Sequence, residues 1–281
     1  MKTILVPSDF STNATTALKY AIQLNKIFKY KLVVFNCVHE SPYTLSKAKT
    51  ETEMERLIRK DEKETTLKLK QQVDKAYFDS GISETPLSVK YIAEFNPLFV
   101  EKTLEVAKKN NSQLIVMGTH GASGIKKLFF GSNTSVMISK SDIPVLAVPE
   151  KYTFKEINIL TYASDFENIS TELNKVIAFA KILKAQINVL HIDYGLDSND
   201  ELLNKAKEVI KKNRYKNIKL TLKTADEKPL LKQIKGYLET HQQQCFVMFT
   251  KERSFWNKII IGSKTEEMST ALALPLLSFK K

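Results

Sequence analysis

One stretch of the chain combines glycines, hydroxyl side chains and a helix start in an order that suits an anion. Four of the 8 glycines lie within it, at Gly118, Gly121, Gly124 and Gly131. The apolar run Leu114–Met117 ends at Gly118, and Ser132 opens a predicted helix. Glycines allow backbone N–H groups to approach a phosphate, and a helix N-terminus adds unpaired donors and a partial positive charge. The stretch therefore predicts a phosphate-binding loop between a strand and a helix.

The spacing of these glycines separates the loop from other phosphate-binding motifs. Neither Gly-x-x-x-x-Gly-Lys-Ser/Thr nor Gly-x-Gly-x-x-Gly occurs in the chain. The pattern present is Gly118-x-x-Gly121, nine residues, and then Gly131-Ser132. This pattern resembles the ATP-binding signature of the universal stress protein family.

The resemblance implies ATP bound at the carboxyl ends of the strands, where open α/β sheets generally hold ligands. The residues that match the phosphate and ribose segment are Met117, Gly118, His120, Gly121, Gly131, Ser132 and Asn133. In the turn formed by Pro7, Ser8 and Asp9, the aspartate matches the family's acid near the ribose and a bound magnesium ion. Cys37 matches a position that meets the adenine edge through backbone groups, so this role does not depend on its thiol.

Ordinary structural roles remain open for several of these residues. Ser132 could cap its helix, which is compatible with ligand binding, and Asp9 could cap the helix that follows it. His120 has no matched nucleophile and carboxylate beside it in the sequence, so it does not predict catalysis. Lys126 and Lys127 could lie over the phosphates, but a solvent-facing role is the simpler interpretation.

Apolar runs and polar helical segments alternate along the first part of the chain, which predicts a parallel, doubly wound α/β sheet. The predicted strands are 3–6, 32–38, 87–93, 114–117 and 143–149. The predicted helices run to 28 from a cap at Ser11 or Asn13, and over 45–78, 97–110 and 132–139. The long 45–78 helix is rich in Lys and Glu, and we interpret its polar surface as solvated.

The same pattern returns after a short connection near 150–154. Ser164-Asp165-Phe166 echoes Ser8-Asp9-Phe10, and Gly262-Ser263 answers Gly131-Ser132. Strands are expected at 157–160, 187–193, 245–249 and 274–277, with a shorter helix near 198–213. Two tandem domains of the adenine nucleotide alpha hydrolase-like type, 1–150 and 151–281, fit this repeat better than one large sheet.

The second copy lacks the glycine cradle. Phe249 and Glu252 stand where Gly118 and Gly121 stand in the first copy. A side chain there fills space that a phosphate needs, and Glu252 repels it. We therefore expect one nucleotide per chain, in the first domain. Ser254–Trp256 lies in the former phosphate loop, where it either plugs the vacated pocket or anchors a partner.

Composition restricts the remaining classes of function. The hydrophobic content of 43% and charged content of 26% are typical of a soluble globular protein, and no apolar run is long enough for a membrane span. Cys37 and Cys245 lie in apolar runs and are expected to be reduced core residues in a cytoplasmic protein. The net charge of +12 divides as +5 through Glu150 and +7 after it. No basic arm is apparent, so nucleic acid is an unlikely partner.

These observations favour an ATP-binding universal stress protein in stress signalling, with ATP and magnesium as ligands and no efficient catalysis. One alternative is a slow ATP-hydrolysing or adenylyl-transferring enzyme of this fold, although no second catalytic group is visible. Another is a ligand-free stress adaptor, which the intact glycines argue against. Strands 145–148 and 276–279 are placed to pair, either within the chain or in a homodimer, because an apolar edge needs cover.

Overall fold

The computed structural model describes residues 2–38, 50–83, 85–86, 88–119, 131–195, 199–228, 230–241, 243–250 and 273–281. His120, Gly121, Gly124, Glu252, Ser254–Trp256 and Gly262-Ser263 lie outside these residues. The elements are considered as a first half, through Glu150, and a second half from Lys151.

The first half alternates strands and helices as predicted. Its elements are β1 (Thr3–Pro7), α1 (Thr12–Phe28), β2 (Lys31–Val38), α3 (Glu51–Asp79), β3 (Val89–Phe95), α4 (Phe99–Lys109), β4 (Ser112–Gly118), α5 (Ser132–Lys140) and β5 (Val145–Val148). The Ser11 side chain caps α1 by accepting from the N–H of Ala14 at 3.1 Å, which confirms one of the two expected caps. The expected start of α3 at 45 lies outside the described residues, and Thr50 caps the described helix.

The second half repeats this order. Its elements are β6 (Ile159–Ala163), α6 (Ile169–Leu183), β7 (Gln186–Asp193), α7 (Asn199–Lys212), β8 (Ile218–Thr224), α8 (Leu230–Thr240), β9 (Cys245–Thr250) and β10 (Leu276–Lys280). The expected strands and the helix near 198–213 are confirmed with shifted bounds. The motifs alone had not located α6, β8 and α8, although each is the counterpart of an element in the first half.

All strands belong to one ten-stranded sheet, in the order β3-β2-β1-β4-β5-β10-β9-β6-β7-β8. Within each half every pairing is parallel, as the alternation of strands and helices predicts. The halves meet where β5 pairs antiparallel with β10, for example Leu146 with Leu277. The two halves therefore repeat the same strand order, and their strands nevertheless form one continuous sheet. Because the strands of the two halves run in opposite directions, the carboxyl ends of the first-half strands lie on the opposite side of the sheet from those of the second half.

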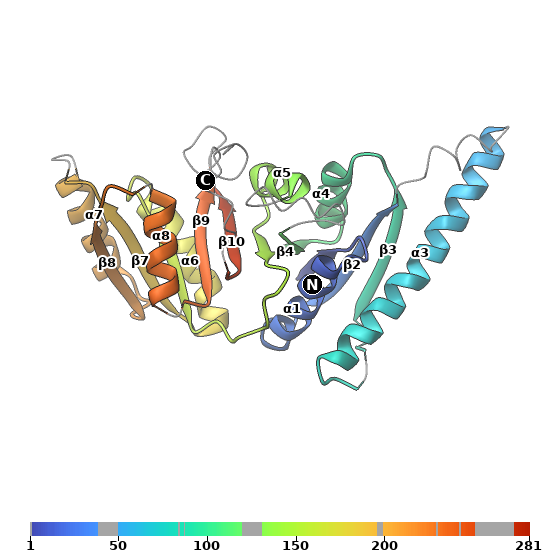
Figure 1. The fold of residues 1–281 in the computed structure, drawn as a ribbon, viewed down its shortest axis with the longest axis horizontal. Coiled ribbons are helices and arrows are strands. Elements are labelled where there is room, and N and C mark those ends of the chain that lie inside the picture. Colours follow the sequence, from blue (N-terminus) through green and yellow to red (C-terminus); the bar gives the residue numbers. More distant parts are fainter. Residues whose placement is uncertain are drawn as a thin grey trace.

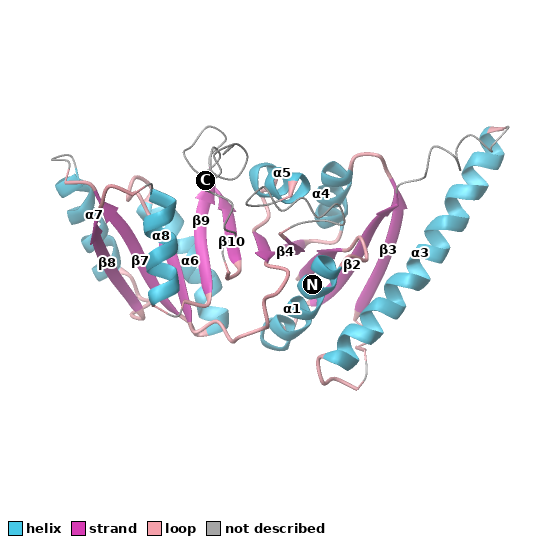
Figure 2. Cartoon of the chain, in the orientation of Figure 1, coloured by secondary structure: helices cyan, strands magenta, loops and turns pink. Residues whose placement is uncertain are grey.

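Helices cover both faces of this sheet (Figures 1 and 2). One buried cluster joins α1, α3, α6 and α7 to alternate strand residues such as Ile4 and Val6. The other joins α4, α5 and α8 to the intervening residues, such as Leu5. This alternation within near-continuous apolar strands is what a sheet buried on both faces requires.

The junction between the halves is packed as a core. The connection after β5 brings Tyr152 and Phe154 against Tyr20 of α1, with ring centroids 5.9 and 5.0 Å apart. Thr16 of α1 also donates to the carbonyl oxygen of Glu150 at 2.9 Å. The pairing of the last strands within the chain is confirmed. Both strands have a neighbour on each side, so in this arrangement they are not available to a second copy.

Candidate functional site

The turn after β1 is held by its own side chains. The N–H of Ser8 donates to the carbonyl oxygen of Phe35 at 2.8 Å, and the buried Ser8 hydroxyl donates to Gln72 at 2.8 Å. The exposed Asp9 accepts from the N–H of Ser11 at 3.0 Å through Oδ1. These contacts place Pro7, Ser8 and Asp9 at the carboxyl end of the central strand of the first half. Asp9 thus stabilises the turn and does not cap α1, because Ser11 is the cap, and this leaves a second role toward a ligand possible.

Beyond this turn, no described strand pairs with β2 on the side of β1. The β1 ladder ends at Pro7, opposite Phe35, whereas β2 continues to Val38 and pairs there with β3. Successive strand residues direct their N–H and C=O groups to opposite neighbours. Because Phe35 faces β1, the backbone groups of Cys37 face the space beyond the end of β1. The structure thus places Cys37 where backbone contact with a ligand is geometrically possible.

The Cys37 side chain is directed elsewhere. Its thiol donates to the carbonyl oxygen of Asn96 at 3.1 Å, and burial raises the pKa of the thiol to about 11. The thiol is therefore protonated and structural near neutral pH. This agrees with an expected role that uses the backbone alone.

Gly118 permits close contact between β4 and the first turn of α1. A Cβ atom at Gly118 would lie 3.0 Å from the carbonyl carbon, carbonyl oxygen and Cβ of Asn13. Real Cβ atoms rarely approach other atoms this closely, so a side chain here would displace the start of α1. Glycine is therefore required at this position by the packing of α1 on β4. The sequence pattern had predicted a different reason, the close approach of a phosphate.

The start of α5 lies beside the end of β4. The N–H of Gly131 donates to the carbonyl oxygen of Thr119 at 2.7 Å, which holds the residue before α5 against the residue after β4. Thr134 donates to the carbonyl oxygen of Gly118 at 2.9 Å and ties the first helical turn to the strand. No side chain in the described residues caps this helix at Gly131, and Ser132 and Asn133 are exposed. The structure therefore brings Met117, Gly118, Gly131, Ser132 and Asn133 together.

The described residues contain no group of three or more His, Cys, Asp or Glu side chains that could hold a metal ion. Asp9 alone of the predicted residues offers a carboxylate at this edge of the first half. A magnesium ion here would need most of its oxygen ligands from phosphates and water, as is usual for Mg²⁺ at nucleotide sites. The residues fit an ion that arrives with its ligand and do not form a separate metal site.

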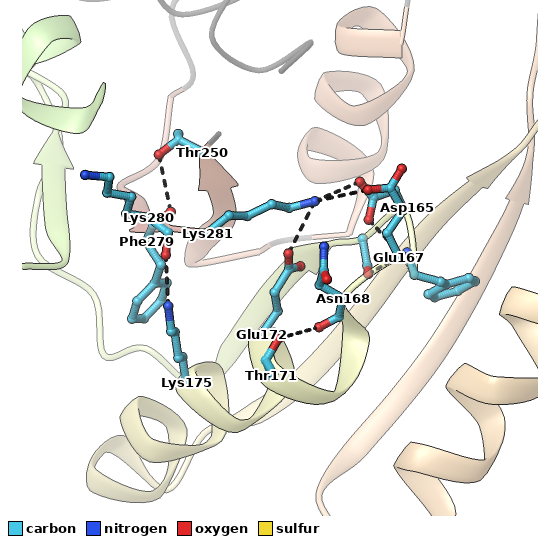
Figure 3. Close-up of polar contacts among 12 residues, drawn as sticks. Asp165, Glu167, Asn168, Thr171, Glu172, Lys175, Thr250, Phe279, Lys280 and Lys281 are labelled. Atoms are coloured by element: carbon cyan, nitrogen blue, oxygen red, sulfur yellow. Dashed lines mark hydrogen bonds and ion pairs between the residues drawn. The ribbon is translucent and has the colours of Figure 1, made fainter. Parts of the chain in front are cut away.

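The second half contains a partly buried ionic cluster at the corresponding end of β6, which the sequence motifs did not reveal (Figure 3). The Lys281 ammonium lies 3.0 Å from Asp165, 3.3 Å from Glu172 and 3.9 Å from Glu167. Its side chain is only 11% exposed. Asp165 is the counterpart of Asp9, and both aspartates are exposed, so in the second half Lys281 pairs with the acid that follows the first strand.

Burial and pairing act against each other in this cluster. Burial raises the pKa of Glu172, and the hydrogen bond from Tyr162 together with the Lys281 charge lowers it less. For Lys281, burial opposes the charged form, but Asp165 and Glu172 outweigh it and raise the pKa. Lys281 therefore supplies a positive charge that is needed by an otherwise costly buried carboxylate.

Aromatic rings pack beside this cluster. The ladders align Leu5 with Ile115 in the first half and Thr161 with Phe246 in the second, which makes Phe249 the counterpart of Gly118. The buried Phe249 ring stacks on Phe279 at 5.1 Å and meets Tyr162 edge to face at 5.5 Å. The sequence correctly predicted a filled position here. It did not identify Tyr162 and Phe279 as the partners.

Sequence comparisons place the chain among proteins of one family. The family model described as the universal stress protein family matches residues 1–149. The chain is 28% identical over 147 residues to universal stress protein MJ0531 of Methanocaldococcus jannaschii, covering 52% of this chain and 81% of that protein. It is 24% identical over 165 residues to universal stress protein MJ0577 of the same organism, covering 53% of this chain and 96% of that protein.

Solved structures extend the likeness in fold to both halves. A universal stress protein from Archaeoglobus fulgidus has a TM-score of 0.69 at 18% identity, with 99% of this chain and 98% of that chain covered. A putative universal stress protein from Pseudomonas aeruginosa has a TM-score of 0.58 at 14% identity, with coverage of 99% and 92%. In the part of the chain that the structure describes, no helix is long and apolar enough to cross a bilayer. Because the family model covers more than half of the 281 residues, the chain belongs to the universal stress protein family.

Proposed function

We propose that this protein binds ATP in its first half and acts in stress signalling through a change of conformation or partner. The proposal treats residues 1–150 as a nucleotide-binding domain and 151–281 as a degenerate copy in a cytoplasmic protein. It rests on the glycine pattern Gly118-x-x-Gly121 and Gly131-Ser132 together with the start of α5. That helix has no side-chain cap in the described residues, and its first turn is exposed beside the end of β4. Unpaired helix N–H groups at a strand end are suited to a phosphate.

In this proposal, each group of site residues contacts a different part of ATP. Gly131, Ser132 and Asn133 would hold the phosphates through backbone N–H groups, with His120 and Gly121 in the preceding loop. The open backbone of Cys37 would meet the adenine edge. Asp9, with Pro7 and Ser8 fixing its turn, would accept from the ribose or from water on a magnesium ion bound to the phosphates.

Efficient catalysis is not part of this proposal. Among the described residues, Asp9 is the one carboxylate that we place at the site, and no general base with a second orienting group accompanies it there. Hydrolysis would need a positioned water and compensation of charge on the transferred phosphoryl group. We therefore propose that any ATP hydrolysis is slow and incidental. An adenylyl-transferring enzyme is the weaker alternative on the same grounds.

Calorimetric titration with ATP, ADP and AMP, with and without magnesium, tests this function. The expected result is saturable binding near one ATP per chain, weakened at least tenfold in Gly121→Glu, which copies the residue found at Glu252. Ser263→Ala is a matched control in the second copy and should leave ATP affinity unchanged. Absence of binding in folded, ligand-free protein would leave the adaptor function. Two ATP per chain would contradict the inactive second half.

A further inference from the structure

The even division of charge between the halves conceals a strong local concentration. The stretch 205–223 holds eight basic residues, Lys205, Lys207, Lys211, Lys212, Arg214, Lys216, Lys219 and Lys223, and one acid, Glu208. Its net charge of +7 equals that of the whole second half, which has 22 basic and 15 acidic residues. Within the described residues, Lys212 alone of the eight forms an ion pair, to Glu208 at 2.8 Å.

These cations surround one edge of the sheet. The stretch forms α7, the turn after it and β8, which is the last strand in the sheet order. Figure 1 shows α7 and β8 at the end of the molecule opposite α3. Lys205, Lys211, Lys216 and Lys219 are exposed. Charge and a sheet edge therefore coincide on one surface, which we call the β8 edge and define by residues 205–223.

The backbone of β8 is unpaired on its outer side. The N–H of Ile187 donates to Asn217 at 2.9 Å, and the N–H of Ala225 donates to Asp193 at 2.7 Å, so the odd-numbered residues between them face β7. The N–H and C=O groups of Ile218, Leu220 and Leu222 consequently face outward. No described residue pairs with them, and the Leu222 side chain is 43% exposed. A free edge of this kind is a template for an added strand.

Charge decides which strand could be added. A second β8 would bring its own lysines, and like charges across a strand pair are destabilising. The undescribed segments of this chain do not supply an acid strand either, because 39–49, 120–130 and 251–272 each carry more basic than acidic residues. Single-stranded nucleic acid would seek exposed aromatic rings. The one aromatic residue of the stretch, Tyr215, is half-buried and donates to the carbonyl oxygen of Ala185.

We propose that the β8 edge binds an extended acidic segment of a partner protein, which adds to the sheet as an eleventh strand. The outward backbone groups of Ile218, Leu220 and Leu222 pair with the segment. The exposed Lys219 meets a carboxylate on one face of it, where Lys223, which donates to the carbonyl oxygen of Gln233 at 3.4 Å, adds positive charge. Leu222 meets an apolar side chain on the other face. This surface is separate from the proposed ATP site and does not depend on it.

Fluorescence anisotropy with a defined peptide tests the proposal on the full chain. The probe alternates Glu with Val over the length of β8, 7 residues. A second peptide of the same sequence has every internal amide N-methylated, which keeps the carboxylates and removes the donors. We expect saturable binding of the first peptide and at least tenfold weaker binding of the second. Equal binding of both would overturn strand addition, and absence of binding would overturn the site.

Charge variants locate the interaction. Lys219→Glu/Lys223→Glu should weaken peptide binding at least tenfold, and Lys219→Gln/Lys223→Gln should weaken it by a smaller factor without adding repulsion. Lys68→Glu/Lys70→Glu makes the same charge change on exposed residues of α3 and should leave affinity within twofold. Equal losses in both charge-reversal variants would indicate nonspecific attraction and contradict the proposal.

Two further measurements separate strand addition from other contacts. Hydrogen exchange of the saturated complex should show new protection at the amides of Ile218, Leu220 and Leu222. Unchanged exchange there would contradict the proposal. A short mixed-sequence DNA duplex should bind more weakly than the peptide at equal salt. Tighter binding of the duplex, lost in Lys219→Glu/Lys223→Glu, would reassign the surface to nucleic acid.

Discussion

The turns after β1 and β6 share a backbone and differ in their surroundings. In each, a serine hydroxyl accepts from the N–H of a phenylalanine, at 3.2 Å for Phe10 and 3.1 Å for Phe166. Both phenylalanines have positive φ, 63° and 66°. Phe10 is nevertheless 39% exposed, whereas Phe166 is fully buried and stacks on His191 at 4.2 Å. The turn therefore belongs to the scaffold, and the space around it distinguishes the halves.

The described side chains around the two turns differ. Asp9 and Asp165 are both exposed, and Asp165 is paired with the Lys281 ammonium at 3.0 Å. Gly118 allows α1 to approach β4, whereas the Phe249 ring occupies the matching position against Tyr162. The same turn backbone can thus have different side chains packed around it. In the second half, the Lys281 ammonium pairs with Asp165 and Glu172, and the Phe249 ring packs against Tyr162 and Phe279.

The largest effect is expected when a buried aromatic ring is removed from the second half. Phe249→Ala removes a buried ring from between Tyr162 and Phe279 and should lower the free energy of unfolding by about 4 kcal/mol. Urea denaturation followed by circular dichroism measures the loss, and Phe249→Leu should recover part of it. A loss below about 1 kcal/mol would mean that the ring is not a core element. It would also weaken the view that this site is closed by packing.

Removal of the internal cation should have the next largest effect. Lys281→Met leaves Glu172 buried without its ammonium partner, and at pH 8 we expect a loss of about 3 kcal/mol. Lys175→Met is the control, because that ammonium donates to the carbonyl oxygen of Lys280 on the surface. A loss no larger than in this control would contradict the role assigned to Lys281.

The same variant should show a specific pH dependence. Burial raises the pKa of Glu172, so the stability linked to this group is fully present below its unfolded pKa, about 4.3, and is lost as pH rises through the folded value. Lys281→Met raises the folded pKa further and extends the loss to higher pH. The difference in unfolding free energy from the unmodified protein should widen between pH 5 and pH 8. A constant difference would contradict the coupling.

A smaller effect is expected from adding one methyl group at Gly118 in the first half. Gly118→Ala places a Cβ 3.0 Å from backbone atoms of Asn13, which overpacks the start of α1 and should cost about 2 kcal/mol. ATP affinity should fall with it, because α1 and β4 frame the proposed site. Gly236→Ala is the matched control, since a Cβ there would have no neighbour within 4 Å. Unchanged stability in Gly118→Ala would show that α1 can move away freely.

The smallest effect belongs to the exposed member of the phenylalanine pair. Phe10→Ala should change the free energy of unfolding by less than about 1 kcal/mol, because much of the ring is already in contact with water. Phe166→Ala should cost about 4 kcal/mol, since its ring is fully buried. Thermal and urea denaturation of both variants give the comparison. Equal losses would contradict the contrast between the two turns.

Sequence patterns were sufficient to predict most of the architecture. The apolar runs identified the strands that form both sheet halves, and the alternation of elements identified a parallel sheet. The pairing of 145–148 with 276–279 followed from the need to cover an apolar edge, and β5 and β10 confirm it. β8 was missed because its alternating Lys and Leu residues lack the apolar continuity of a strand buried on both faces.

The candidate site was predicted less completely, because its physical contacts cross large distances in the chain. The Gly118 requirement depends on Asn13, which approaches it through the packing of α1 on β4. The Lys281 cluster joins residues separated by more than 100 positions, and no local motif encodes such a contact. The basic stretch 205–223 is visible in the sequence, but the net charge of each half does not reveal it.

The antiparallel pairing of β5 with β10 has a consequence for symmetry. In a homodimer joined through such strands, every substitution appears in both subunits, so one binding site cannot be lost while the other is retained. In this chain the same junction is intramolecular, and Phe249 and Lys281 each occur once. Covalent linkage also keeps the junction formed at any dilution. A fused pair can therefore change one half without changing the other, so the proposed ATP site in the first half and a purely structural role of the second half are compatible.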